Sequence, residues 1–192
     1  MPETGFAIWV VGLPGSGKST LAKAVHARLL EHGHDAVLLQ MDARRKAYFP
    51  NPTYSAEERA QAYAMFIDEA ATLVEQGRAV VMDGTAYRAA MRREARKCIA
   101  RFAEILVRCD VREAMRREAS RPKGLVMAGL YCKALERQET GKQFDGLGDV
   151  VGVDVPFEED SGAEFMIDNT TLSKAETRAA VVAFLDSWLK NA

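Results

Sequence analysis

The sequence predicts an α/β fold in which a mainly parallel five-stranded sheet carries helices on both faces. Two observations support this fold class. Five short apolar runs are spread along the chain, and stretches with helical periodicity alternate with them. Strands that alternate with helices favour parallel pairing, with helices covering the sheet. The 192 residues contain no repeat and no low-complexity linker, so residues 1–192 are predicted to form one domain.

The first strand and helix come directly after the N-terminus. The apolar run at 6–11 predicts a buried strand. Leu21, Val25 and Leu29 recur at helical spacing and therefore share one face of a helix. Gly33 follows the last of them, where a helix end is expected.

The second and third strands flank a long helix. The run at 36–41 predicts the second strand, and the run at 79–82 predicts the third. Between them, Ser55 and Glu58 have the spacing of a capping box, in which two side chains satisfy the free amides of a helix start. The helix that opens there is predicted to end at Gly77.

The second half of the chain completes the sheet. An arginine-rich helix is predicted from about residue 87 to 101, followed by strands at 103–107 and 164–168. Ser173 and Glu176 form a second capping pattern before the last helix. The stretch 121–160 differs from the rest because it is rich in glycine and has little periodicity. It is predicted to be a ligand-facing lid or substrate region.

The overall charge and hydropathy argue against several classes of protein. The net charge of −1 lacks the basic excess of proteins that bind nucleic acids or membrane surfaces. The arginines at 88–101 are offset by acids elsewhere, so they predict a solvated helix face with one or two phosphate-facing arginines. No apolar run approaches the roughly 20 residues of a membrane span. The first residues lack a signal-peptide pattern, so a cytoplasmic protein is expected.

The most specific motif follows the first strand. Gly12, Gly17, Lys18 and Ser19 match G-x-x-x-x-G-K-[ST], the P-loop. Glycines let the backbone turn its amides toward phosphate oxygens, and the start of the following helix adds the positive end of its dipole. Lys18 is expected to reach the β- and γ-phosphates. The predicted ATP-binding residues are Gly12, Pro14, Gly15, Ser16, Gly17, Lys18, Ser19 and Thr20.

Acidic residues after two strands suggest a magnesium site and a reacting group. Ser19 is expected to bind Mg²⁺ through its hydroxyl. Asp83 ends the third strand, where it would either hold the ion through water or cap a turn. Asp42 and Arg45 follow the second strand at D-x-x-R spacing. Asp42 is placed to accept a proton or ligate Mg²⁺, and Arg45 to hold an acidic substrate. The alternative for this pair is a solvated charged loop.

These features favour a small P-loop kinase over a molecular switch. A GTPase would need a base-specificity motif such as N-K-x-D, which the sequence lacks. Small P-loop kinases commonly place an acid and an arginine after the second strand, where they receive the acceptor hydroxyl. The fold expected is therefore a single-domain P-loop kinase, with ATP and Mg²⁺ as cofactors.

Several segments together resemble adenylylsulfate kinases, which use ATP to phosphorylate the 3′-hydroxyl of adenosine 5′-phosphosulfate in sulfate assimilation. The family pattern D-G-D-x-x-R is matched in its second half by Asp42 and Arg45. The pattern F-S-x-x-D-R is followed with conservative changes by Tyr54, Ser55, Glu58 and Arg59. Three downstream motifs appear in the family order: "RPKGLVMAGLYCKA" (121–134), "FDG" (144–146) and "GVDVPFEE" (152–159).

The resemblance implies roles for particular residues. Tyr54 and Phe144 would stack on the two faces of the acceptor's adenine, unless they merely pack in the core. Arg45 and Arg59 would bind the phosphosulfate. Arg88, Lys123 in the lid and Asp42 would complete the substrate site, and Lys18, Asp42 and Arg45 would be the catalytic residues. A homodimer is compatible with the family's frequent dimerisation.

The sequence departs from the family pattern in the acceptor region. Gln40 and Met41 replace the first acid and the glycine of D-G-D, and Ala62 stands where the family has an asparagine. Short insertions separate "KGL" from "GLYCKA" and "FDG" from "GVDVP". Two alternatives therefore stay open: a kinase for another nucleotide-linked or sugar hydroxyl, such as a cytidine diphospho-derivative, and a non-catalytic ATP-binding module.

Overall fold

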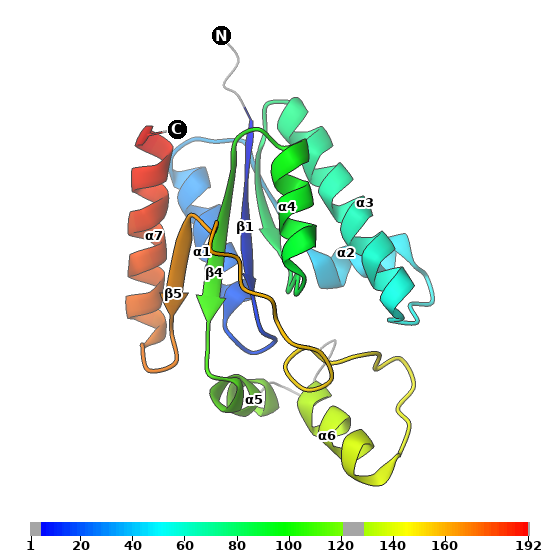
Figure 1. The fold of residues 1–192 in the computed structure, drawn as a ribbon. Coiled ribbons are helices and arrows are strands. Elements are labelled where there is room, and N and C mark those ends of the chain that lie inside the picture. Colours follow the sequence, from blue (N-terminus) through cyan, green and yellow to red (C-terminus); the bar gives the residue numbers. More distant parts are fainter. Residues whose placement is uncertain (1–4, 121–128, 192) are drawn as a thin grey trace.

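The structure is a computed structural model that describes residues 5–120 and 129–191 (Figure 1). Its centre is a five-stranded sheet in the order β2-β3-β1-β4-β5, and every pair of neighbouring strands is parallel. The strands are β1 (Phe6–Gly12), β2 (Ala36–Gln40), β3 (Ala79–Asp83), β4 (Phe102–Arg108) and β5 (Phe165–Asp168). The predicted fold class, an α/β protein with a parallel five-stranded sheet, is confirmed.

Helices cover both faces of the sheet. In Figure 1, α1 and α7 lie on one side of the sheet, and α3 and α4 lie on the other. The helices are α1 (Lys18–Glu31), α2 (Met41–Tyr48), α3 (Ala56–Glu75), α4 (Ala89–Cys98), α5 (Val111–Ala119), α6 (Leu130–Thr140) and α7 (Lys174–Asn191).

The central strand β1 contributes side chains to both hydrophobic cores. Trp9 and its neighbours at alternate positions pack against α3 and α4, whereas Ile8 and its neighbours pack against α1 and α7. Successive side chains of a strand point to opposite faces of a sheet, so an all-apolar run such as 6–11 can fill two cores at once. The unbroken apolar run therefore reflects burial of β1 on both faces.

The parallel register brings the carboxyl ends of the strands to one edge. Asp83 at the end of β3 lies opposite Val10 of β1 on one side and Gln40 of β2 on the other. The segments that leave these strands lead into the P-loop, α2 and the β3–α4 loop. Ligands of open parallel sheets bind at this edge, so the topology itself gathers the predicted site residues.

Three helices were not predicted, and one of them lies in the stretch that has little periodicity. Residues 121–160 contain α6, which starts after Gly129 and ends at Gly141, both in the left-handed conformation. One face of α6 is buried with Leu147 and Val150 in a small separate hydrophobic cluster. Residues 130–140 are therefore helical, although the sequence showed little periodicity there. The other two unpredicted helices are α2, which follows β2 without a loop, and α5, which follows β4.

The arginine-rich helix is not simply a solvated face. It is shorter than predicted, at Ala89–Cys98, and Arg92 is fully buried. The Nε of Arg92 lies 2.8 Å from the buried carboxylate of Glu104 in β4, and its Nη atoms donate to the backbone oxygens of Ala86 and Glu158. The expected role toward solvent or phosphate is wrong for Arg92, because it joins α4 to β4 inside the protein.

Hydropathy identifies no membrane-crossing helix within residues 5–120 and 129–191.

Candidate active site

The P-loop connects β1 to α1 in a conformation that requires glycine. Gly15 and Gly17 have φ angles of 84° and 95°, in the left-handed region where other residues are strained. A Cβ at Gly15 would also lie 2.2 Å from the backbone oxygen of Ala114 in α5. Helix α1 begins at Lys18, directly after Gly17. Its first amides are therefore available at the loop, together with the positive end of the helix dipole.

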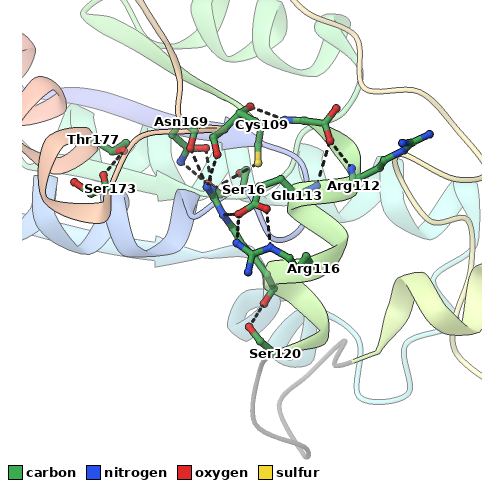
Figure 2. A network of polar contacts seen from close by, with 12 residues as sticks. Ser16, Cys109, Arg112, Glu113, Arg116, Ser120, Asn169, Ser173 and Thr177 are labelled. Carbon is green, nitrogen blue, oxygen red and sulfur yellow. Dashed lines mark hydrogen bonds and ion pairs between the residues drawn. The ribbon is translucent and has the colours of Figure 1, made fainter.

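Residues from distant segments hold the P-loop from outside. The Asn169 side chain donates to the backbone oxygen of Ser16 at 2.8 Å (Figure 2). Arg117 of α5 in turn donates to the side-chain oxygen of Asn169 at 3.0 Å and forms an ion pair with Glu113. The Tyr131 hydroxyl donates to the backbone oxygen of Pro14 at 2.9 Å. Sequence reasoning missed these residues, because no local pattern relates them to the P-loop.

Ser19, Gln40 and Asp83 meet where α1, β2 and β3 converge. The Ser19 hydroxyl donates to one carboxylate oxygen of Asp83 at 3.1 Å, and the Gln40 amide donates to the other at 3.2 Å. Asp83 is almost completely buried. Hydroxyl and carboxylate oxygens are the ligands that Mg²⁺ prefers, and this ion often takes only one or two of its ligands from protein. The donor set therefore fits a magnesium ion that is shared with nucleotide phosphates.

A cavity of about 490 Å³ joins the P-loop to α2, α3 and the β3–α4 loop. It is the larger of two cavities described within residues 5–120 and 129–191. Eight of the predicted site residues line it, namely Pro14, Lys18, Ser19, Asp42, Arg45, Tyr54, Arg59 and Asp83. Residues that are far apart in the sequence are thus brought to one concave surface.

Asp42 and Arg45 belong to α2, not to a charged loop. Their spacing of three residues puts them on one face of the helix, with Asp42 exposed and Arg45 only 6% exposed. The Arg45 guanidinium forms an ion pair with Glu58 at 3.1 Å and lies 5.1 Å from the centroid of the Tyr54 ring. The alternative of a solvated loop is therefore wrong for Arg45.

Arg59 and Arg88 both contact the ring of Tyr87. Each guanidinium carbon lies 5.4 Å from the centroid of that ring. Arg59 is buried, lines the cavity and donates to the backbone oxygen of Asp149 at 2.7 Å. Arg88 is exposed, and it is not among the residues that line either described cavity.

The second predicted aromatic residue lies elsewhere. Phe144 packs beside the cluster formed by Leu130, Tyr131 and their neighbours, and the Lys142 ammonium lies 4.8 Å from the centroid of its ring. The described residues bring Tyr54 into the cavity but do not bring Phe144 there. For Phe144, the packing alternative is the arrangement observed. Lys123 lies outside the described residues.

Tyr63 of α3 is a further cavity residue that sequence reasoning missed. Its hydroxyl accepts a hydrogen bond from the backbone amide of Ala86 at 2.7 Å, and burial raises the pKa of Tyr63 to about 12. Ala86 has a φ of 42°, which is uncommon for a residue other than glycine. Tyr63 and Arg92 thus hold opposite sides of Ala86 and keep the β3–α4 loop in this conformation.

Comparisons with known proteins agree with this geometry. The model of the family described as adenylylsulphate kinase matches residues 4–168. A probable adenylyl-sulfate kinase of Archaeoglobus fulgidus is 32% identical over 163 residues, covering 85% of this chain and 95% of the relative. The adenylyl-sulfate kinase of Bacillus pumilus is 29% identical over 185 residues, covering 95% and 86% of the two chains.

Solved structures show the same relationship. The Mycobacterium tuberculosis APS kinase CysC, in complex with AMPPNP and APS, is 27% identical with a TM-score of 0.78. The match covers 96% of this chain and 99% of that one. A gluconokinase from Sinorhizobium meliloti shares the fold, at 20% identity and a TM-score of 0.60 over 98% of this chain and 96% of that one. The chain belongs to the adenylylsulphate kinase family.

Proposed function

We propose that the protein transfers the γ-phosphoryl group of ATP to the 3′-hydroxyl of adenosine 5′-phosphosulfate. The main support for this proposal is that one cavity contains both P-loop residues and residues of α2 and α3, in a chain that belongs to the adenylylsulphate kinase family. One set, at the P-loop, suits a triphosphate. The other set, on α2 and α3, suits an anionic nucleotide acceptor. Phosphoryl transfer depends mainly on positioning and charge stabilisation, which this arrangement supplies.

On the donor side, the P-loop amides and Lys18 would bind the phosphates of ATP. Ser19 and Asp83 would hold Mg²⁺, Ser19 directly and Asp83 through water. When bound, the ion would neutralise charge on the β- and γ-phosphates. Gln40 keeps the Asp83 carboxylate turned toward Ser19. These groups therefore form a site for a nucleotide–metal complex at the start of α1.

On the acceptor side, Asp42 would orient the attacking hydroxyl and accept its proton. Arg45 and Arg59 would bind the phosphosulfate, and Tyr54 would stack on the adenine. The roles suggested for Arg88, Lys123 and Phe144 stay predictions. A homodimer and a cytoplasmic location also stay predictions.

The proposal is tested by incubating the protein with ATP, Mg²⁺ and single acceptors and identifying products by mass spectrometry. The panel contains adenosine 5′-phosphosulfate, AMP, a cytidine diphospho-derivative, a nucleotide sugar and gluconate. The expected product is adenosine 5′-phosphosulfate with one added phosphate on the 3′-oxygen. If only another compound of the panel is phosphorylated, that compound is the acceptor and adenosine 5′-phosphosulfate is not. ATP binding without any product would support a non-catalytic module.

A further inference from the structure

Glu58 lies in the acceptor region, and its side chain makes contacts that a helix-capping role does not explain. It is the third residue of α3, and its backbone amide donates to the Ser55 hydroxyl at 3.1 Å, as a capping box requires. The carboxylate does not simply complete the box. It is buried, with only 8% of the side chain exposed, and it contacts α2 and the two residues before Ser55.

Four donors converge on the two oxygens of this carboxylate. One oxygen accepts from Arg45 at 3.1 Å and from the backbone amide of Tyr54 at 3.2 Å. The other accepts from the backbone amide and from the hydroxyl of Thr53, the latter at 2.8 Å. Burial alone would raise the pKa of Glu58, but the hydrogen bonds from Thr53, Tyr54 and Arg45 outweigh it and lower the pKa. The group is therefore a carboxylate at neutral pH.

These contacts hold Tyr54 in an uncommon backbone conformation. Tyr54 has a φ of 58°, and Glu58 binds its amide on one side. On the other side the chain passes so closely that a Cβ at Gly148 would lie 2.4 Å from the Tyr54 backbone oxygen. The same carboxylate holds Arg45, whose guanidinium lies over the Tyr54 ring. Glu58 thus holds both Tyr54 and Arg45 in place, and these two residues line the cavity.

We propose that Glu58 is a positioning residue of the acceptor pocket, which holds Arg45 and the Thr53–Tyr54 backbone in the arrangement that receives an anionic nucleotide. It acts through these neighbours and not by touching the substrate. The inference rests on the proposed function, because it assigns Glu58 to the acceptor and not to ATP.

The decisive variant is Glu58→Gln, which keeps the shape and removes the charge. Each carboxylate oxygen receives two donors, so an amide turned either way places its own N–H groups against donors. The matched control is Glu57→Gln, which makes the same change of charge at the exposed neighbouring position in the first turn of α3.

Steady-state kinetics should distinguish Glu58→Gln from Glu57→Gln. Glu58→Gln should raise the KM for adenosine 5′-phosphosulfate roughly tenfold or more, and the KM for ATP should stay within about twofold. Glu57→Gln should leave both unchanged. Equal rises in the two KM values, or equal behaviour of the two variants, would overturn the proposal. If Glu58→Gln does not fold, Thr53→Val removes one donor and should raise the acceptor KM about threefold, whereas no change would overturn the proposal.

A second measurement needs no substrate. The amides of Thr53 and Tyr54 should exchange with solvent roughly tenfold faster in Glu58→Gln than in Glu57→Gln, because their acceptor is weakened. If the wild type phosphorylates no acceptor, the proposed function fails. The holding role of Glu58 is then judged by this exchange alone. Unchanged exchange would show that Glu58 does not hold the segment.

Discussion

The Ser19 hydroxyl donates to the Asp83 carboxylate at 3.1 Å, across the 64 residues that separate them in the sequence. This contact joins the first turn of α1 to the end of β3 at the edge where the site lies. It exists because β3 pairs directly with β1, so that Ser19, two residues after the last P-loop glycine, faces the last residue of β3.

Replacing Asp83 with Asn should weaken metal binding in the presence of nucleotide. An amide keeps the size of the side chain but supplies no negative charge to a divalent cation. We expect the affinity for Mn²⁺, measured by electron paramagnetic resonance in the presence of a nonhydrolysable ATP analogue, to fall about tenfold or more. Asp68→Asn, on the exposed face of α3, is the control. Equal affinities in the two variants would remove Asp83 from the metal site.

Replacing Lys18 with Ala should abolish turnover while the fold is retained. The ammonium is expected to stabilise charge on the transferring phosphoryl group, and loss of such a group costs roughly 10²–10³-fold in kcat. The control is Lys23→Ala, an exposed lysine in the same helix. Product formation is measured with saturating ATP, and circular dichroism checks the fold. Turnover by Lys18→Ala at the wild-type rate would contradict the assignment.

Replacing Tyr54 with Ala should weaken acceptor binding more than ATP binding. Stacking on a base is worth about 1–3 kcal/mol, which corresponds to a rise of roughly 5- to 150-fold in the acceptor KM. Phe144→Ala is the comparison. Because Phe144 packs beside the α6 cluster, this variant should lower the melting temperature and change the acceptor KM little. Equal effects of the two variants on that KM would instead support the aromatic sandwich.

Replacing Arg92 with Met should destabilise the fold strongly. It would leave the fully buried Glu104 without its nearer ion-pair partner, with Arg96 3.8 Å away, and would leave two backbone oxygens without their donor, at a cost of about 3–5 kcal/mol. Denaturant unfolding measures the change. Adding Glu104→Leu to this variant should recover part of the loss, because it removes the buried carboxylate that has lost this partner. Further destabilisation by the second change would contradict this account.

Acidification should remove a contribution from the contact between α1 and α7. Asp186 accepts two hydrogen bonds from Arg28, and these lower the pKa of Asp186 to about 2. A carboxylate with a lowered pKa stabilises the folded state above its unfolded pKa of about 4, and this contribution disappears as the pH falls toward 2. The pair is partly exposed, so solvent screening keeps this contribution small.

The measurement is the difference in unfolding free energy between wild type and Asp186→Asn. The difference should shrink as the pH falls below 5 and should be largely lost near pH 2. Asp68→Asn, which changes an exposed carboxylate on α3, should show no such pH dependence. A difference that persists at pH 2 would exclude the ion pair as its source.

The sheet and the P-loop could be predicted because their signals are local. A buried parallel strand requires a continuous apolar run, and a phosphate loop requires its glycines and lysine at fixed spacing. Helix α2 carried no such signal. Its buried residues are Met41 and Arg45, and the burial of Arg45 depends on Glu58, which lies 13 residues away.

Other residues could not be predicted for the same reason, because their partners lie far away in the sequence. Nothing near Arg92 indicates that its partner is an acid in the interior of β4. Asn169 contacts Ser16 across 153 residues, and no pattern within either segment encodes that contact. Local spacing therefore identified the residues of the P-loop, and the tertiary structure was needed to find the residues that hold it.

The bond from Asn169 to the P-loop has a consequence for how the protein is made. The glycine-rich loop is synthesised before the amide that holds its backbone, because Asn169 follows β5 and lies 153 residues after Ser16. A nascent chain that stops before β5 contains the whole P-loop motif but neither the last strand of the sheet nor this amide. The nucleotide site is thus completed only after all the strands of the sheet have been synthesised.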